Sequence, residues 1–340
     1  MKTTTIFFCF ISLLFFSTCS EDPIPEEKPQ APDTFAKGAD VSWLTEMEKA
    51  GRKFYNTSGR EMDCMALLQE QGVNAIRLRV WVNPANGWCN KEDMLVKAIR
   101  AHNLGMKLMI DFHYSDSWAD PGKQTIPAAW ENLNLEEMKQ AVALHTTTTL
   151  ELLKSKGLTP EWVQVGNETS NGMLWPMGQA DTNMANYAAL NNAGYDAVKS
   201  VFPDAKVIVH LPNGDNNNLY RWLFDGLKKN NGKWDMIGMS LYPSADNWQE
   251  KNNRCIANVK DVISRYGTEV MICEVGMPWN QSTAAKAFLS DLISQAKQIA
   301  GAKCQGVFYW EPQSYSNWNG YTLGAFDDSG KPTIALEAYK

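Results

Sequence analysis

The chain has 340 residues, of which 44% are hydrophobic and 21% charged, a composition typical of one large globular domain or two smaller ones. Its net charge of −6 argues against a nucleic-acid partner, because phosphate binding requires a basic surface. The 13 tryptophans favour a neutral, sugar-like ligand, since a flat indole can cover the C–H face of a sugar ring, although many of them are expected to serve only in packing.

The N-terminus is predicted to be a targeting segment. One lysine precedes an apolar run over residues 6–16 that is too short to span a bilayer, and small residues then lead to Cys19. Residues 1–18 resemble a bacterial lipoprotein signal peptide, which implies lipidation of Cys19. A plain secretory signal with an incidental cysteine is the alternative. Residues 19–34 are acidic and Pro-rich and are expected to form a tether, so the folded domain spans 35–340.

Short apolar segments alternate with longer amphipathic ones through this domain. Eight of the short segments are strand candidates: residues 37–44, 73–82, 105–114, 161–168, 205–212, 234–243, 269–276 and 304–312. Between most of them, apolar residues recur at helical spacing, and several of these helices end on a glycine. Eight β-then-α units without a break in composition predict an α/β fold, a (β/α)8 TIM barrel with one catalytic domain. A doubly wound open sheet is the alternative.

No cofactor or metal is expected from the sequence. Beyond the targeting segment and Cys19 there are five cysteines, an odd number, and their spacings match no metal-binding pattern. Cys273 and Cys304 lie in apolar runs and are predicted to be core residues. No Gly-rich loop suggests a phosphate site.

Polar side chains collect where the predicted strands end, and in a barrel these ends form the rim on which active sites are built. Two carboxylates on this rim suit acid/base chemistry, because Glu168 and Glu274 each terminate a strongly apolar run. Burial would raise a carboxyl pKa and a nearby Arg77 or Arg79 would lower it, so the two could hold different protonation states. The alternative is a purely structural network of these glutamates and arginines.

The domain from about Lys37 onward resembles glycoside hydrolase family 53, the endo-β-1,4-galactanases. The matching stretches follow the family's order: "KGADVSWL", "GVNAIRLRVWVNP", "MIDFHYSDSWADPGKQTIPAAW", "VQVGNE", "IVHLPNG", "MIGMSLYP", "ICEVG" and "YWEP". "GNE" alone is weak, whereas the second and third stretches together are specific. The resemblance implies retaining, endo-acting hydrolysis of β-1,4-galactosidic bonds in galactan or type I arabinogalactan, the side chains of pectin, by a protein expected to be a monomer.

The resemblance also implies roles for individual residues. Glu168 would be the general acid/base and Glu274 the nucleophile of a covalent intermediate, with their carboxyl groups roughly 5 to 5.5 Å apart. Asn167 would hold the sugar 2-hydroxyl. Arg77 would keep Glu274 ionised, and Tyr242 would donate a hydrogen bond to the same carboxylate. Arg79 is the alternative to Arg77 for this contact. Trp310 would form the floor of the catalytic sugar subsite. The strand 3 motif would shape the cleft through Asp111, His113, Asp116 and Trp118.

Several alternatives stay open at this point. Another retaining glycosidase of the same clan, acting on mannan, xylan or arabinan, would share this machinery, and a non-catalytic glycan-binding lipoprotein is a second alternative. Some bacterial members carry calcium after strand 7, but residues 276–292 lack a dense cluster of oxygen ligands, so no metal is expected there. An outer-membrane anchor through Cys19 is expected, on the cell surface or the periplasmic face. Loop tryptophans are candidate outer sugar platforms: Trp88, Trp130, Trp175, Trp248, Trp279 and Trp318.

Overall fold

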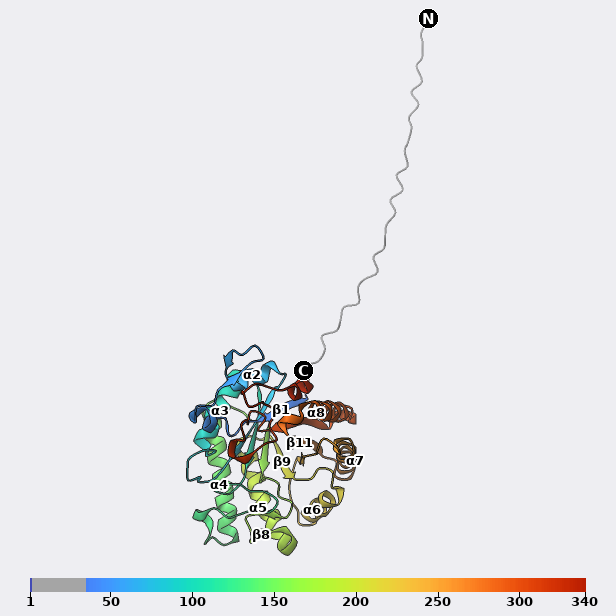
Figure 1. The fold of residues 1–340 in the computed structure, drawn as a ribbon. Coiled ribbons are helices and arrows are strands. Elements are labelled where there is room, and N and C mark those ends of the chain that lie inside the picture. The colour runs from blue at the N-terminus through green and yellow to red at the C-terminus, as the bar shows by residue number, and fades with distance from the viewer. Residues whose placement is uncertain (2–34) are drawn as a thin grey trace. The chain divides into compact units, whose positions relative to one another are not determined.

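The computed structural model describes Met1 and residues 35–340 (Figure 1). The predicted signal peptide, the tether and Cys19 lie outside the described residues. Phe35 to Lys340 form one compact unit. No helix within the described part of the chain has the length and apolarity needed to cross a membrane.

Eight parallel strands close into a barrel in the order β1-β12-β11-β10-β9-β6-β5-β4. The strands are β1 (Ala36–Asp40), β4 (Ala75–Val80), β5 (Lys107–Phe112), β6 (Trp162–Val165), β9 (Lys206–Leu211), β10 (Met236–Leu241), β11 (Glu269–Val275) and β12 (Cys304–Trp310). Each predicted strand segment overlaps one of them: β1 begins one residue before its predicted segment, and the other seven lie within theirs. The prediction of a (β/α)8 barrel is therefore confirmed, and the open sheet is wrong because β1 pairs with both β4 and β12.

Helices surround the strands, as Figure 1 shows. They are α1 (Leu44–Lys49), α2 (Cys64–Glu70), α3 (Lys91–Asn103), α4 (Leu135–Lys154), α5 (Ala180–Val201), α6 (Asn217–Lys229), α7 (Trp248–Tyr266) and α8 (Ser282–Lys297). Their starts are fixed locally: Asn134 caps α4 in a capping box with Glu137, and Asn90 caps α3. The loops add two small hairpins, β2–β3 (Phe54–Tyr55, Glu61–Met62) and β7–β8 (Gly172–Met173, Gly178–Gln179), and short 3-10 turns at Ala128–Trp130, Trp279–Gln281, Ala300–Ala302, Trp318–Gly320 and Ile334–Tyr339.

The barrel interior is filled by side chains rather than open. Its lower layers hold Ala36, Ala75, Met109, Trp162, Ile208, Met236, Met271, Cys273 and Phe308. Gly38 on β1 makes room for this packing, since a Cβ there would lie 2.1 Å from the Phe308 ring. The outward-facing residues of the strands pack against the helices in a larger core. All five cysteines of the described domain are free and buried, including Cys273 and Cys304, which confirms these two as core residues.

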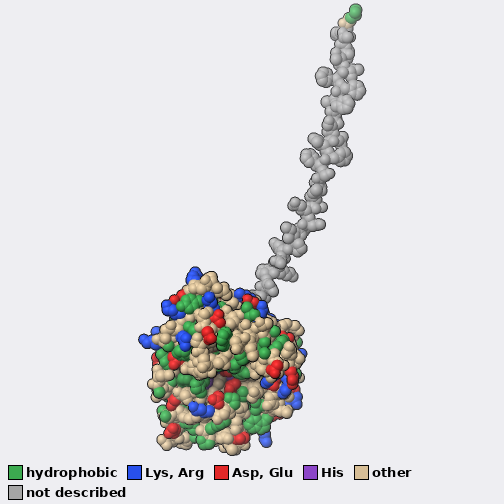
Figure 2. All heavy atoms as spheres, viewed as in Figure 1, with side chains coloured by type: hydrophobic (Ala, Val, Ile, Leu, Met, Phe, Trp, Pro, Cys, Tyr) green, Lys and Arg blue, Asp and Glu red, His purple; other side chains and the backbone are tan. Residues whose placement is uncertain are grey.

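The surface charge is mixed. On the face shown in Figure 2, basic and acidic side chains are interspersed among neutral ones. The surface charge on this face therefore points to no particular ligand, and the active site is expected at the rim formed by the carboxyl ends of the strands.

Candidate active site

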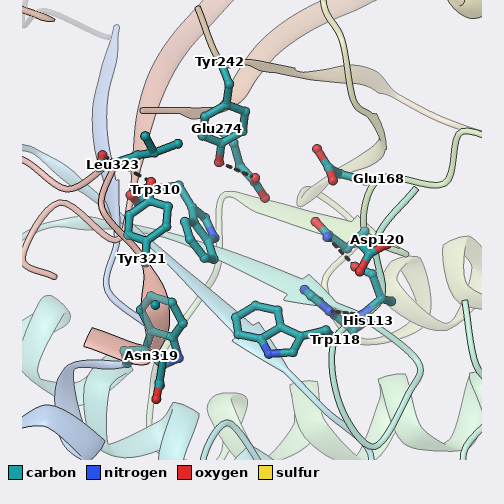
Figure 3. Close-up of a pocket in the computed structure, with 14 residues that line it drawn as sticks. His113, Trp118, Asp120, Glu168, Tyr242, Glu274, Trp310, Asn319, Tyr321 and Leu323 are labelled. Carbon is teal, nitrogen blue, oxygen red and sulfur yellow. Dashed lines mark hydrogen bonds between the residues drawn. The ribbon is translucent and has the colours of Figure 1, made fainter. Parts of the chain in front are cut away.

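A cavity of about 470 Å³ lies at the carboxyl end of the barrel (Figure 3). Residues from the strand ends and the following loops line it: Trp43, His113, Trp118, Ala119, Asp120, Asn167, Glu168, Tyr242, Glu274, Trp310, Asn319, Gly320, Tyr321 and Leu323. Figure 3 shows Glu168 and Glu274 on neighbouring walls, with Trp118 and Trp310 below them. The structure therefore brings the two predicted carboxylates into one cavity.

A strained turn presents Glu168. Strand β6 ends at Val165, and Gly166 follows with a φ of 84°, where a Cβ would lie 2.6 Å from Thr169. Glu168 itself has a φ of 45°, a conformation that costs a non-glycine residue about 1 kcal/mol. The amide of Thr169 donates to the His210 carbonyl at 2.9 Å and secures the turn. The chain leaves the strand abruptly, so Glu168 projects from the rim instead of continuing the ladder.

Arg77, on β4, lies under the cavity and is fully buried. Its guanidinium lies within 3.0 Å of five acceptor oxygens. The guanidinium contacts the carboxylates of Asp40 at 2.8 Å, Asp111 at 2.9 Å and Glu274 at 2.8 Å. It also donates to side-chain carbonyl oxygens at 2.6 Å and 3.0 Å, those of Gln164 and Asn167 respectively. Because a guanidinium can only donate, each of these oxygens faces it as an acceptor, and Arg77 orders the groups around it.

Arg77 makes the contact with Glu274, which answers the question that the sequence left open. Arg79, two residues along the same strand, instead pairs with Glu311 at 3.2 Å. Its guanidinium lies over the Trp118 ring, 4.2 Å from the centroid, and Trp81 and Trp43 flank it at 5.2 and 5.5 Å. Arg79 is thus a buried cation behind the aromatic wall of the cavity.

The Glu274 carboxyl is almost completely buried, and burial raises its pKa. Arg77 lowers this pKa, whereas an ionised Glu168 raises it. Burial also raises the pKa of Glu168. Two carboxyls that repel one another in this way share one proton at neutral pH. The ion pair with Arg77 and a 2.9 Å hydrogen bond from the Tyr242 hydroxyl both stabilise an ionised Glu274, so the proton resides on Glu168.

The predicted motif at the end of β5, the third barrel strand along the chain, has an inner part under the cavity and an outer part in the loop. Asp111 is buried, and its carboxylate accepts from Arg77 and, at 3.0 Å, from Nε2 of His113. Burial raises the pKa of Asp111, but Arg77 and His113 outweigh that effect, and the pKa is lowered. Asp116 does not line the cavity: its two oxygens accept from the backbone amides of Asn83 and Ala128, each at 2.9 Å. Asp116 therefore anchors the loop that carries Trp118.

Aromatic side chains form the floor. Trp310 packs edge-on against Trp43 at 5.1 Å and Trp118 at 5.8 Å between ring centroids, and Tyr321 packs against Trp310 at 4.6 Å. A T-shaped cluster of this kind holds each ring rigidly while leaving one face of it toward the cavity. Such a surface suits the apolar face of a sugar.

Sequence reasoning missed part of the lining. Asp120 comes from the loop after β5, and the loop after β12 supplies Asn319, Gly320, Tyr321 and Leu323. Gly276, after β11, permits this arrangement, since a Cβ there would lie 2.8 Å from the Tyr321 hydroxyl. Of the loop tryptophans proposed as sugar platforms, none lines the cavity, and Trp130 is buried. Among residues 35–340, no group of three His, Cys, Asp or Glu side chains is arranged to hold a metal ion.

The sequence model of glycosyl hydrolase family 53 matches residues 36–339, almost the whole described domain. The chain belongs to glycosyl hydrolase family 53. Among family 53 relatives, the arabinogalactan endo-β-1,4-galactanase of Humicola insolens is 33% identical over 89% of this chain and 98% of its own length. The endo-β-1,4-galactanase of Bacillus subtilis is 33% identical over 82% of this chain and 70% of its own.

A solved family 53 structure has the same fold. The catalytic domain from Ignisphaera aggregans superposes with a TM-score of 0.82 at 29% identity, covering 92% of this chain and 97% of that domain. The resemblance drawn from the sequence motifs is thereby confirmed at the level of family and fold. Family 53 membership makes the protein a glycosidase, and its cavity carries the chemistry.

Proposed function

We propose that this protein is a retaining endo-β-1,4-galactanase that hydrolyses galactan and type I arabinogalactan. The observation that carries the proposal is a pair of glutamates in one aromatic-floored cavity, of which Glu274 is ion-paired with Arg77 and Glu168 is not. The family 53 relatives named as galactanases support the choice of galactan as substrate.

In the first step, the Glu274 carboxylate attacks the anomeric carbon while Glu168 protonates the leaving glycosidic oxygen. Arg77 and the Tyr242 hydroxyl both hold the Glu274 oxygens, so the attacking carboxylate is oriented before substrate arrives. Trp310 lies beneath the reacting sugar. Asn167 lines the cavity next to Glu168 and is held by three neighbours, so it is placed to contact the 2-hydroxyl, where hydrogen bonds strengthen in the oxocarbenium-like transition state.

In the second step, Glu168 has become ionised and removes a proton from water, which attacks the galactosyl ester of Glu274. The anomeric configuration is inverted twice and is therefore retained. Neither step requires a metal or an organic cofactor, because the two carboxyls supply the acid, the base and the nucleophile.

The test is hydrolysis of a polysaccharide panel. Linear galactan should be cleaved to oligosaccharides, while mannan, xylan and arabinan should be left intact. Proton NMR of the first products should show the β-anomer. Initial formation of the α-anomer would exclude a retaining mechanism, and cleavage of xylan or mannan in preference to galactan would assign the site to another polysaccharide.

We further propose that the protein is exported, anchored to the outer membrane by lipid on Cys19, and active as a monomer. The motif around Cys19 and the acidic, Pro-rich residues 19–34 support the anchor, since they would tether the barrel at a distance from the bilayer. Radiolabelled palmitate should label the wild-type protein but not a Cys19→Ala variant. Protease treatment of intact cells then distinguishes the cell surface from the periplasmic face.

A further inference from the structure

Trp222, on α6, is the one tryptophan of the described domain with a largely exposed side chain. All 13 tryptophans of the chain lie within that domain, and the others are buried or half-buried, whereas Trp222 is 44% exposed. Within residues 35–340 its indole makes no hydrogen bond and packs against no other ring or cation. The ring is therefore free to cover a ligand.

A hollow of about 490 Å³ lies beside Trp222, between the start of α5 and the middle and end of α6. These helices are neighbours on the outside of the barrel (Figure 1). The hollow, here called the α5–α6 hollow, is lined by residues that include Asp181 and Met184 from α5 and Trp222, Asp225, Gly226 and Lys229 from α6. None of these residues lines the catalytic cavity, and a volume of this size is typical of ligand sites.

The pattern of α6 does not explain a tryptophan at position 222 by packing. The helix buries one apolar stripe against the barrel, consisting of Tyr220, Leu223, Phe224 and Leu227. Trp222, Asp225 and Lys229 follow one another at spacings of three and four and lie on a second stripe, which is exposed. A large apolar ring thus stands among polar residues on the solvent side of the helix.

Gly226 gives the hollow its apolar part. A Cβ at this position would lie 2.4 Å from the side chain of Met184, so any larger residue would push Met184 away from α6. A glycine inside a helix lowers helix stability, but here it allows the half-buried Met184 to pack closely against α6. The hollow therefore combines an indole and a thioether with polar groups.

The polar groups around the indole have unused hydrogen-bonding capacity. Asp181 and Lys229 are exposed, and neither side chain forms a hydrogen bond or ion pair within the described part of the chain. The Asp225 carboxylate is held by Arg265 at 2.6 and 3.1 Å and by the Tyr266 hydroxyl at 2.9 Å, which leaves it able to accept further bonds. Lys229 and Arg265 balance the two carboxylates, so the hollow does not select a charged ligand.

A neutral sugar is the ligand that would use all of these groups. Its C–H face would cover the indole, and its hydroxyls would donate to the carboxylates and accept from the Lys229 ammonium. An apolar protein partner fits less well, because the neighbours of Trp222 on the exposed stripe are polar.

We propose that the α5–α6 hollow is a second, non-catalytic sugar site that binds a segment of galactan. The choice of galactan as the sugar rests on the proposed function. A polymer held at this site stays close to the enzyme, which raises the local concentration of bonds that the catalytic cavity can cleave.

Hydrolysis of long and short substrates tests the proposal. Trp222→Ala should lower kcat/KM on long galactan by roughly three- to tenfold, because it removes the indole that covers the sugar. On an aryl galactobioside, which is too short to occupy both sites, kcat/KM should not change. Trp222→Phe keeps a ring and should lose less. Leu144→Ala, on the exposed face of α4, is the matched control and should behave like the wild-type protein on both substrates. An equal loss on both substrates, or no loss on galactan, would overturn the proposal.

Fluorine-19 NMR detects binding at the hollow without hydrolysis. The Glu274→Gln variant is labelled with 5-fluorotryptophan, and the Trp222 resonance is identified by its absence in a further Trp222→Phe change. β-1,4-Galactotetraose should move this resonance, and at a different concentration from the resonances of Trp118 and Trp310 in the catalytic cavity. No movement at millimolar tetrasaccharide would overturn the proposal. Movement with protein concentration in the absence of sugar would mean that a second copy of the chain covers Trp222, and would overturn it too.

The two measurements separate this inference from the proposed function. A wild-type protein that does not cleave galactan, but whose Trp222 resonance responds to the tetrasaccharide, would refute the proposed function alone. Cleavage of galactan with an unresponsive Trp222 would refute the second site alone.

Discussion

Replacing Glu274 with Gln should abolish hydrolysis and at the same time stabilise the fold at neutral pH. The cavity holds Glu274 and Glu168 close to Asp111, and burial and mutual repulsion raise the pKa of both carboxyls above the ordinary 4.5. At neutral pH the folded protein therefore retains one proton on the pair, on Glu168, that the unfolded chain releases above pH 4.5. This contribution to stability is complete below that pH and is lost as the pH rises, which amounts to about 3 kcal/mol at pH 7 because each pH unit above 4.5 costs about 1.4 kcal/mol.

A neutral glutamine in place of Glu274 ends the repulsion between the two carboxyls and so reduces this loss. At pH 7.5 the Tm of Glu274→Gln should exceed that of the wild-type protein by about 5 °C, and at pH 4 the two should agree within about 1 °C. Galactan hydrolysis should fall by a factor on the order of 10⁴ or more. Thermal unfolding followed by circular dichroism at both pH values measures the difference. A Tm of the variant at pH 7.5 equal to or below that of the wild-type protein would show that the pair of buried carboxyls does not destabilise the fold.

Three other substitutions address the support of the site. Tyr242→Phe removes the 2.9 Å hydrogen bond to Glu274 and should lower kcat/KM on galactan by roughly 10- to 100-fold, without a change in Tm above about 2 °C. Arg77→Lys replaces a planar guanidinium among five acceptor oxygens with a single ammonium and should lower kcat/KM further than Tyr242→Phe does; near-normal activity would contradict the role given to Arg77. Arg79→Met leaves the buried Glu311 carboxyl without its cation, and burial already raises the pKa of that carboxyl to about 8. The free energy of unfolding, measured in urea at pH 8, should fall by about 3 kcal/mol. A second change, Glu311→Gln, should recover much of that loss.

The barrel and the two carboxylates could be predicted because they depend on local patterns. A strand that is buried on both faces appears in the sequence as a continuous apolar run. A polar residue at the end of such a run is therefore expected at the rim of the barrel. Glu168 and Glu274 are found this way without knowledge of tertiary structure. Which arginine reaches Glu274 could not be predicted, because Arg77 and Arg79 point to the same side of β4 and differ only in height along the barrel.

The rest of the lining comes from loops, whose course has no periodic signature. The loop after β12 turns through Ser316, Asn317 and Asn319, all with positive φ, before it brings Tyr321 over Trp310. Asn and Gly mark such turns in the sequence but do not say where the chain goes next. Asp116 was predicted to shape the cleft but holds backbone amides of a loop instead. The sequence alone does not distinguish a carboxylate with that role from one that faces a ligand.

Arg77 explains how two chemically identical side chains come to differ. Through its ion pair it stabilises negative charge on Glu274 directly. Glu168 has no such ion pair with Arg77, and burial raises its pKa. A cation placed equally close to both carboxyls would favour ionisation of both and would weaken the acid. Because the guanidinium contacts Glu274 directly, it favours the carboxylate at that glutamate and leaves the proton of the pair to Glu168.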